Sequence, residues 1–514
     1  MADVDAVVVG AGPNGLVAAN LLADAGWDVL VLEAKSEPGG AVKTAEVTKP
    51  GYGHDLFSAF YPLAAASPVF KDLRLEDHGL VWRHAPLALA HPTPDGRCAV
   101  LSRDIDETAA SFDTYAEGDG DAWRALFGLW ERIGDGFVNA MLRPFPPIAG
   151  IARVVGALRP SELMPMARLA LLPVRRLAVE TFKGAGGGLI LAGNALHADL
   201  TPETPGSGLF GLILAALGQQ VGFPVPEGGA AGITNALVNR MQATGRVELR
   251  CDTPVVGISV VNGKATAVQT AQGDVFRVRR AVLADVVAPT LYEHLLPSGP
   301  LPARTLDDLN RFEFDSATVK IDWAVEDSGV PWSHPDAARA GTVHLADSMN
   351  HLTDVASTLA KKEMPAKPFL LTGQMHVADP TRKPTVWAYT HIPHGHLLDE
   401  AALAEFADAV EDVMESHAPG FRKAVLARHV MGPADLERRN PNLVGGAING
   451  GTAQLHQQLF FRHGATARTP IDGLYLASSS AHPGGGVHGG PGANAAIAAL
   501  SRSRPWRAVA ARLR

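Results

Sequence analysis

The sequence lacks several features that mark particular protein classes. Its 514 residues hold only two cysteines, Cys98 and Cys251, with neither CxxC spacing nor a disulfide framework, so a reducing cytoplasm is the expected location. No apolar run reaches the roughly 18 residues of a membrane span, and no signal peptide precedes the first apolar segment. The net charge of −8 argues against nucleic-acid binding. We therefore expect a globular cytoplasmic protein without a membrane-spanning helix.

Glycine, by contrast, is abundant. The chain holds 53 glycines and 46% of its residues are hydrophobic, which is typical of a globular, loop-rich protein and not of a disordered one. Its length exceeds what one compact core usually contains, so two interleaved lobes are the simplest partition.

The first forty residues predict a dinucleotide-binding unit. An apolar run at residues 6–9 predicts a buried parallel strand, residues 13–25 predict a helix, and residues 29–32 predict a second strand. Because a glycine turn joins the first strand to the helix, an anion is expected at the positive N-terminus of that helix.

The glycines of this unit have separate roles. Gly10 allows the sharp turn, Gly12 lets backbone N–H groups approach a pyrophosphate, and Gly15 lets helix and strand pack closely. Glu33 ends the second strand and is expected to accept hydrogen bonds from ribose hydroxyls. An acid there disfavours a 2′-phosphate. These residues alone leave both NAD and FAD open.

A second glycine pair, Gly39 and Gly40, would again bring the backbone against phosphate or ribityl oxygens. With that pair, the start of the chain resembles the FAD-binding segment of the glutathione-reductase-2-type flavoproteins. That superfamily includes flavin amine oxidases, phytoene desaturases and Rab escort proteins. The stretch GYGHDLFSAFYP at residues 51–62 resembles the phytoene desaturase branch, in which an aspartate, here Asp55, recurs.

Two further segments carry the resemblance. The block at residues 226–245 resembles the central glycine turn and helix of this superfamily, whose following strands contact the adenine at the position of Val255. Residues 473–500 read as a strand, a His-Pro-Gly loop and a helix beginning near Gly492 or Asn494. In the desaturases and the related ketolases this loop lies beside the flavin, and the helix dipole stabilises negative charge on the reduced ring.

The loop departs from the family pattern in two places. Residues 478–481 read Ser-Ser-Ser-Ala where many relatives have glycine and threonine, and His488 stands where proline is common. The resemblance otherwise covers essentially the whole chain in the family's order.

The resemblance implies an α/β fold: a Rossmann-like FAD-binding domain with an interleaved substrate domain of mixed β-sheet plus helices. Residues 1–95, 222–290 and 441–514 are assigned to the FAD-binding domain, and residues 96–221 and 291–440 to the substrate domain with a helical lid. The residues expected to hold FAD are Gly10, Gly12, Pro13, Asn14, Gly15, Glu33, Ala34, Lys35, Gly39, Gly40, Ala41, Val42, Val255, Ser479, Ser480, Gly486 and Val487.

The substrate domain should contain a sheet that faces the flavin. Residues 317–325, 369–377 and 386–392 read as its strands, and residues 398–416 read as a helix. Residues 281–286, AVLADV, read as a buried strand that returns the chain from the FAD domain.

Four residues are candidates for catalysis. Lys320 follows the return strand at roughly the distance at which flavin amine oxidases carry a lysine that holds water against the flavin, although a lysine at a sheet edge could instead reach solvent. His482 and His488 flank the glycine-rich loop and could act as acid or base, or hydrogen-bond the loop backbone. Asp55 could accept a proton or serve as a turn residue.

A histidine group, THIPHGH at residues 390–396, suggests a metal site at first sight. No acidic or cysteine partner lies nearby in the sequence, and Pro393 breaks any regular face. We predict no metal site. His391, His394 and His396 then either line the substrate site or belong to a strand-to-loop turn.

A basic segment at residues 137–183 contrasts with the acidic whole. It carries Arg143, Arg153, Arg159, Arg168, Arg175, Arg176 and Lys183 against only Glu162 and Glu180, interleaved with aliphatic residues. Such a surface can lie on anionic lipid and pass an apolar substrate from bilayer to tunnel, or it can be a lid whose arginines face water. The C-terminal tail SRSRPWRAVAARLR allows the same two interpretations.

The sequence therefore predicts an FAD-dependent oxidoreductase that takes a hydride from an apolar molecule, such as an isoprenoid of carotenoid biosynthesis or a lipid. Only one GxGxxG triplet occurs, so dioxygen or a quinone is the expected oxidant of the flavin. A flavin amine oxidase is one alternative, against which no obvious aromatic pair marks an amine site. A non-catalytic prenyl-binding escort protein is another, but such proteins have lost flavin binding whereas the glycines and Glu33 are present here.

Overall fold

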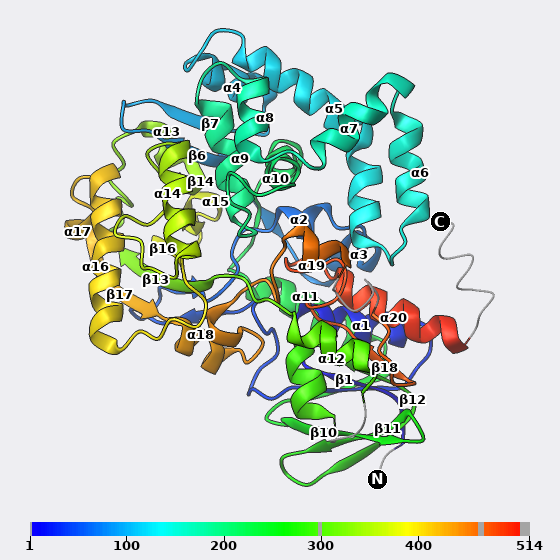
Figure 1. Ribbon diagram of the computed structural model, residues 1–514. Coiled ribbons are helices and arrows are strands. Elements are labelled where there is room, and N and C mark those ends of the chain that lie inside the picture. Colours follow the sequence, from blue (N-terminus) through cyan, green and yellow to red (C-terminus); the bar gives the residue numbers. More distant parts are fainter. Residues whose placement is uncertain (1–2, 297–300, 461–466, 504–514) are drawn as a thin grey trace.

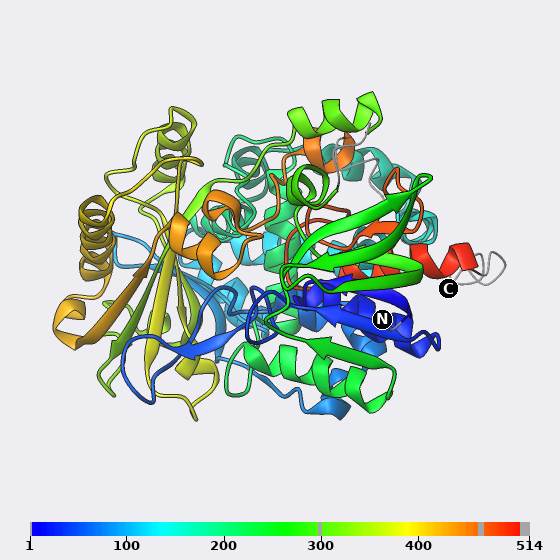
Figure 2. The same cartoon turned by 90° about the horizontal axis from the view of Figure 1, so that it is seen from below.

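The computed structural model describes residues 3–296, 301–460 and 467–503. Two sheets organise the chain into two lobes, and a group of helices lies against both (Figure 1). Seen from below, the first sheet, blue and green, lies beside the second, olive to orange (Figure 2). The α/β fold class is confirmed, with a Rossmann-like lobe and an interleaved mixed sheet.

The first sheet has the strand order β10-β11-β12-β1-β2-β9, and β18 pairs with β12. Strands β1, β2, β9, β18 and the end of β12 run parallel, whereas β10, β11 and the start of β12 form an antiparallel extension. The strands are β1 (Val4–Val9), β2 (Val29–Leu32), β9 (Val247–Arg250), β10 (Val255–Val261), β11 (Lys264–Thr270), β12 (Val275–Ala284) and β18 (Leu474–Leu476).

Three helices pack on one face of this sheet: α1 (Pro13–Asp24), α11 (Ala231–Ala243) and α20 (Gly490–Ser503). The central strand β1 is buried on both faces, as its continuous apolar run predicts. The predicted β1-α1-β2 unit is present, and α20 begins two residues before the predicted Gly492.

The second sheet has the order β17-β13-β16-β15-β14-β6-β7. Its strands are β6 (Leu87–Pro92), β7 (Cys98–Leu101), β13 (Ala317–Val325), β14 (Ala340–Leu345), β15 (Leu370–Gln374), β16 (Thr385–Ile392) and β17 (Val425–Met431). Strand β15 ends at Gln374 and not at Val377, because the helix α15 (Met375–Ala378) follows directly.

Alternation along β13 gives this sheet two different faces. Val319, Ile321 and Trp323 belong to an apolar core that is completed by α16 (Glu400–His417). Lys320 is paired with Tyr389 on β16, and both side chains line the cavity on the opposite face. One face therefore stabilises the lobe, and the other presents polar and aromatic groups.

A helical layer closes the cavity. It comprises α4 (Ile105–Asp113), α5 (Asp119–Leu142), α6 (Ile148–Ala157), α7 (Leu163–Leu169), α8 (Val174–Thr181), α9 (Gly186–Leu196) and α10 (Ser207–Val221). Helix α9 is buried over its whole length, and α10 packs against it. Trp123, Phe127, Ile190 and Leu212 contribute to their shared core. Among the residues that the structure describes, no helix is long and apolar enough to cross a membrane.

Shorter elements connect these layers. The strands are β3 (Thr44–Glu46), β4 (Gly53–Asp55), β5 (Trp82–Arg83) and β8 (Val225–Pro226), and the helices are α2 (Pro62–Ala66), α3 (Pro68–Leu73), η1 (Leu75–His78), η2 (Pro160–Glu162), η3 (Thr290–Leu295), α12 (Ala303–Asn310), α13 (Pro335–Arg339), α14 (Met349–Ala360), α17 (Phe421–Ala424), α18 (Pro433–Arg439), η4 (Val444–Gly446) and α19 (Leu455–Phe460).

Two groups of elements lie on the other side of the predicted domain boundaries. Strand β6 pairs with β14 and so belongs to the second sheet, which places the first boundary before Leu87 and not at residue 95. Leu291, Leu295 and Leu309 pack with the first sheet, so residues 291–296 and α12 extend the first lobe. Neither the pairing of β6 with β14 nor the packing of η3 and α12 on the first sheet leaves a local signal in the sequence.

Candidate functional site

A cavity of about 620 Å³ is lined by the glycine turns of the first lobe, by the polar face of the second sheet and by the helical layer. Gly12, Asn14 and Gly40 come from the first lobe, Lys320 and Tyr389 from the second sheet. Phe137, Leu209, Phe210 and Ile213 supply an apolar wall from the helices. One space therefore joins the predicted nucleotide turn to an apolar chamber.

The glycine turn between β1 and α1 has no room for side chains. A Cβ on Gly15 would lie 2.2 Å from the carbonyl oxygen of Gly10, and one on Gly40 would lie 3.0 Å from the Cα of Gly12. Helix α1 begins after Gly12, which has no side chain to cap it, and Pro13 at its first position has no N–H group. The Oδ1 atom of Asn14 is also buried without a hydrogen-bond partner in the described chain. The close backbone approach at the glycines and the helix N-terminus fit the diphosphate of a dinucleotide, whereas the Asn14 oxygen can only accept, as from a ligand hydroxyl.

Glu33 closes the loop beside this turn. Its Oε2 accepts a hydrogen bond from the backbone N–H of Ala11 at 2.8 Å, and its Oε1 accepts one from Lys35 at 2.9 Å. The backbone N–H of Thr253 donates to the carbonyl of Glu33 at 2.8 Å, which brings the chain that leads to Val255 beside Glu33. Ala41 and Val42 line the cavity, while Ala34, Lys35 and Gly39 lie in the same turn outside its lining.

Asp285 is a site residue that sequence reasoning missed. It follows β12, and its Oδ2 accepts a hydrogen bond from the backbone N–H of Gly15 at 3.0 Å. Burial, with a smaller effect of the Glu33 charge, raises the pKa of Asp285 to about 7. Asn442 donates to the carbonyl of Asp285 at 2.9 Å and fixes its position. The sequence could have indicated Asp285 through topology. A residue that follows a strand parallel to β1 lies at the carboxyl edge of the sheet, where dinucleotides bind.

The C-terminal loop contributes to the same cavity through Ser479, Gly486 and Val487. Ser480 instead holds the loop in place, since its hydroxyl donates to the carbonyl of Gly450 at 2.9 Å and accepts from the N–H of Ala288 at 3.1 Å.

His488 lines the cavity, and its ring also hydrogen-bonds the backbone of the loop, while an acid-base role for it stays a prediction. Its Nδ1 accepts from the N–H of Gly490 and its Nε2 pairs with the carbonyl of Gly485, both at 3.1 Å. Burial lowers the pKa of His488 to about 4, so the ring is neutral. His482 lines the cavity, and its Nε2 lies 3.1 Å from the carbonyl oxygen of Arg143 on the lid.

Lys320 lies on the cavity wall and not at an exposed sheet edge. Strand β13 has β16 on one side and β17 on the other, and Lys320 is 2% exposed. Its Nζ donates to Oδ1 of Asp322, and His54 Nδ1 lies 3.6 Å from the same oxygen. Burial alone would raise the pKa of Asp322, but the charges of Lys320 and His54 hold it below its usual value. The buried carboxylate therefore fixes the ammonium group in place.

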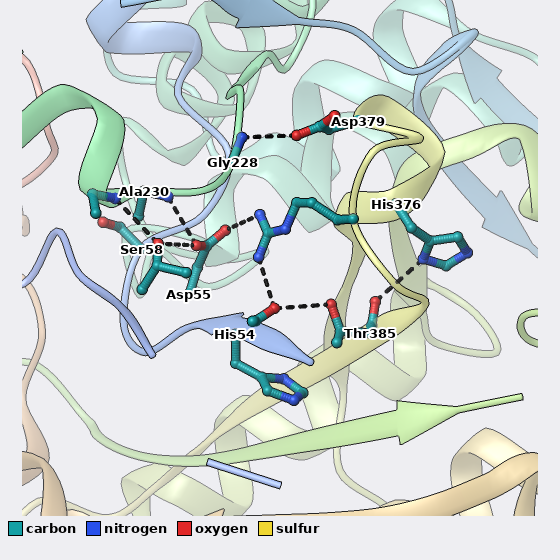
Figure 3. Close-up of polar contacts among 12 residues, drawn as sticks. His54, Asp55, Ser58, Gly228, Ala230, His376, Asp379 and Thr385 are labelled. Atoms are coloured by element: carbon teal, nitrogen blue, oxygen red, sulfur yellow. Dashed lines mark hydrogen bonds and ion pairs between the residues drawn. The ribbon is translucent and has the colours of Figure 1, made fainter. Parts of the chain in front are cut away.

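Asp55 joins the two lobes and is not among the residues that line the cavity. Its Oδ2 pairs with Arg382 Nη1 at 2.9 Å, and its Oδ1 accepts from Ala230 N–H and from the Thr44 hydroxyl, both at 2.8 Å (Figure 3). Arg382 also donates to the carbonyl of Gly53 at 2.9 Å. Arg382 therefore makes Asp55 a link between the two lobes, and a proton-accepting role for Asp55 stays a prediction.

Two aromatic rings that the sequence pattern did not reveal as a pair line the chamber. Trp387 and Tyr389 lie two residues apart on the same face of β16 and stack with ring centroids 5.7 Å apart. The ring centroid of Phe60 lies 6.2 Å from that of Trp387. The side chain of His391 is close to an acid after all, because its Nε2 lies 3.5 Å from Oδ1 of Asp199. Within the described ranges no group of three or more metal-binding side chains occurs.

The basic segment forms part of the lid. Arg168 and Arg176 both pair with Glu180, Arg143 pairs with Asp72, and Arg175 pairs with Glu203. Eight of the 14 exposed large apolar residues of the described chain lie between residues 145 and 179. They are Phe145, Ile148, Ile151, Val155, Leu163, Met164, Leu171 and Val179. The segment thus exposes apolar groups more than free charge. The C-terminal tail beyond Ser503 lies outside the described residues.

Comparison with known proteins is consistent with this geometry. Residues 8–73 match the NAD(P)-binding Rossmann-like domain family. The chain is 29% identical to pyridine nucleotide-disulfide oxidoreductase domain-containing protein 2 of Rattus norvegicus, over 96% of this chain and 93% of that protein. It is 28% identical to hydroxyneurosporene desaturase of Cereibacter sphaeroides, over 94% of each. A structure of putrescine oxidase bound to putrescine superposes with a TM-score of 0.61 at 18% identity, covering 98% of this chain and 99% of that one.

Proposed function

Because this chain belongs to the FAD-dependent oxidoreductase superfamily, we propose that it binds FAD and removes a hydride from an apolar, isoprenoid or lipid-like molecule. The observation that carries the proposal is the single cavity that runs from the glycine turns to an apolar chamber. A narrow nucleotide cleft alone would not require that chamber.

The residues of this chain suit the parts of FAD. The N-terminus of α1 with Gly12 and Gly40 would hold the diphosphate, and Glu33, whose oxygens can each accept a second hydrogen bond, would hold the ribose. The loop residues Ser479, Gly486 and Val487 would contact the flavin end. When bound, FAD supplies the hydride acceptor.

Lys320 is the residue that we propose for charge stabilisation in the chamber. Asp322 fixes its ammonium group on the cavity wall, and the surrounding apolar residues exclude water, so the charge acts at short range in a low-dielectric site. A preorganised ammonium favours negative charge that develops during reduction of an oxidant. With one glycine triplet in the sequence, dioxygen or a quinone is the proposed oxidant.

Anaerobic mixing of the FAD-loaded protein with carotenoid precursors, fatty acyl compounds and amines tests the substrate class. Loss of the flavin absorbance band with an isoprenoid or acyl compound, and not with amines, is the expected result. If only amines bleach the flavin, the second candidate function, amine oxidation, would replace the first.

That second candidate is amine oxidation, and the stacked pair of Trp387 and Tyr389 favours it. Against it, Asp285 is the one carboxylate among the described residues that line the cavity, and it lies at the glycine turn. The chamber itself therefore offers no acid to a cationic amine.

We also propose that the lid docks on a membrane surface from which the substrate enters. The helices α5, α6 and α7 lie together at one side of the molecule (Figure 1). Their segment contributes Phe137, Met141 and Phe145 to the cavity lining and exposes Ile148 and Met164, which are 73% and 78% accessible. Exposed apolar groups beside an apolar cavity are typical of lipid-facing surfaces. Because most arginines of the lid are paired, apolar insertion should contribute more than anionic lipid.

A further inference from the structure

Among the described residues that line the cavity, seven carry a buried polar side-chain atom without a hydrogen-bond partner, and three of these atoms lie on the wall formed by α9, β14 and β16. They are Oδ1 of Asn194, the hydroxyl of Thr342 and the indole N–H of Trp387, on residues that are between 0% and 4% exposed. All three residues line the cavity. A buried polar group without a hydrogen bond costs free energy, so three of them together call for a ligand that completes them.

The three residues lie in one corner of the chamber. Thr342 on β14 and Trp387 on β16 are both paired with Gly373 on β15, where a Cβ would lie 2.5 Å from the Trp387 ring. The ring therefore lies over the bare glycine between them. Asn194 follows Gly193 on α9, and a Cβ on Gly193 would lie 2.1 Å from Nδ1 of His344. His344 and Thr342 share one face of β14, so α9 packs closely against that face.

The hydrogen-bonding capacity of this corner is mixed. The side-chain N–H of Asn194 already donates to the carbonyl of Ile190 at 2.9 Å, so its free Oδ1 accepts. The indole N–H of Trp387 donates, and the hydroxyl of Thr342 does either. A ligand oxygen that both accepts and donates suits this set.

The surroundings of the corner are neutral. His197 Nε2 lies 2.9 Å from His344 Nε2, and the hydroxyl of Tyr389 lies 3.4 Å from His197 Nδ1. Burial lowers the pKa of His197 to about 3 and that of His344 well below its usual range, with neighbouring histidines adding to both shifts. Lys320 Nζ lies 5.9 Å from the Trp387 ring centroid and is already paired with Asp322, so its charge is partly compensated. A ligand carboxylate would therefore gain less from Lys320 than from an unpaired ammonium, and no carboxylate among the described residues of the corner is available to a ligand ammonium group.

We propose that Asn194, Thr342 and Trp387 bind a neutral hydroxyl group on an otherwise apolar substrate. The inference rests on the proposed function and narrows its substrate class to hydroxylated isoprenoids or lipids. The apolar wall of Phe210 and Ile213 receives the hydrocarbon part.

Calorimetric titration of the FAD-loaded protein with ten-carbon isoprenoids tests this inference. The series is geraniol, geranial, the hydrocarbon myrcene, geranate and geranylamine. Geraniol should bind roughly tenfold or more tightly than myrcene and more tightly than geranial, because the hydrocarbon leaves the whole site unsatisfied and the aldehyde cannot donate to Asn194. The acid and the amine should bind more weakly than geraniol. Equal affinity for geraniol and myrcene, or preference for an ion, would overturn it.

Two variants assign the effect to the corner. Thr342→Val and Asn194→Leu should each reduce the affinity for geraniol by about 5- to 10-fold and leave that for myrcene unchanged. Thr390→Val is the matched control, since Thr390 is paired with Val319 on the opposite face of the sheet. Discrimination that survives both variants contradicts the assignment. Flavin content and thermal midpoint are measured for each protein, so loss of FAD, which bears on the proposed function, is distinguished from loss of ligand selectivity.

Discussion

Asp285 accepts a hydrogen bond from the backbone N–H of Gly15, with its Oδ2 at 3.0 Å, directly below the turn that would hold a diphosphate. A Cβ on Gly12 would lie 2.7 Å from the same oxygen. The glycine turn therefore packs against the carboxyl group of Asp285. Burial raises the pKa of this group to about 7. This arrangement couples the protonation of one side chain to the stability of the turn.

Asp285→Asn should stabilise the cofactor-free protein more at pH 8 than at pH 5. The folded chain holds the proton of Asp285 up to about pH 7, whereas the unfolded chain releases it near pH 4, so wild-type stability falls as pH rises between these values. The cost reaches on the order of 4 kcal/mol at most above pH 7. Asn keeps an acceptor for Gly15 and removes the titration. Urea unfolding at both pH values measures the difference, and a gain that does not change with pH contradicts this account.

Breaking the Asp55–Arg382 pair should destabilise the joint between the lobes. Both side chains are at least nine-tenths buried, and removing one partner leaves the other charge unpaired, so Arg382→Met should cost about 3 kcal/mol of unfolding free energy. The double variant Asp55→Leu with Arg382→Met should recover part of that loss. Chemical denaturation checks both. If Asp55→Asn reduced substrate turnover without changing stability, a catalytic role for Asp55 would be supported.

Lys320→Met should retain FAD but slow reoxidation of the reduced flavin by dioxygen by about tenfold or more, because the fixed ammonium charge is lost. Lys320→Arg, which keeps the charge, is the control and should be affected less. Stopped-flow mixing of the photoreduced proteins with oxygenated buffer measures the rates. Unchanged rates in the methionine variant would leave Lys320 with a structural role only.

The lid should bind vesicles without anionic lipid. The double variant Ile148→Ser with Met164→Ser removes two of the most exposed apolar side chains of the lid and should reduce co-flotation with phosphatidylcholine vesicles several-fold. Leu397→Ser is the matched control, because Leu397 is 93% exposed but lies outside the lid. Absence of flotation with or without added anionic lipid removes the membrane proposal.

Local patterns in the sequence predicted the elements that local physics determines. The strand before Gly10 and the helix α1 are determined by residues close to them in the chain. The composition of residues 317–325 likewise predicted the strand β13. The glycine turns were readable because only glycine fits them.

Groups that meet through tertiary packing were not readable in this way. Asp55 pairs with Arg382, and His391 lies beside Asp199, although each pair is far apart in the sequence. The corner of Asn194, Thr342 and Trp387 combines a helix with two strands that are far apart in the chain. Each of these residues is unremarkable in its own segment, and its role follows from the register of the second sheet and the packing of α9.

The most direct measurement of the account is FAD loading of the purified protein. One FAD per chain, with the absorbance bands of an oxidised flavin, is the predicted result. Gly15→Ala should abolish loading, since its Cβ would lie 2.2 Å from the Gly10 carbonyl oxygen, whereas Gly128→Ala on α5, with nothing within 4 Å, should load normally. A folded wild-type protein that stays colourless after incubation with excess FAD would contradict the account.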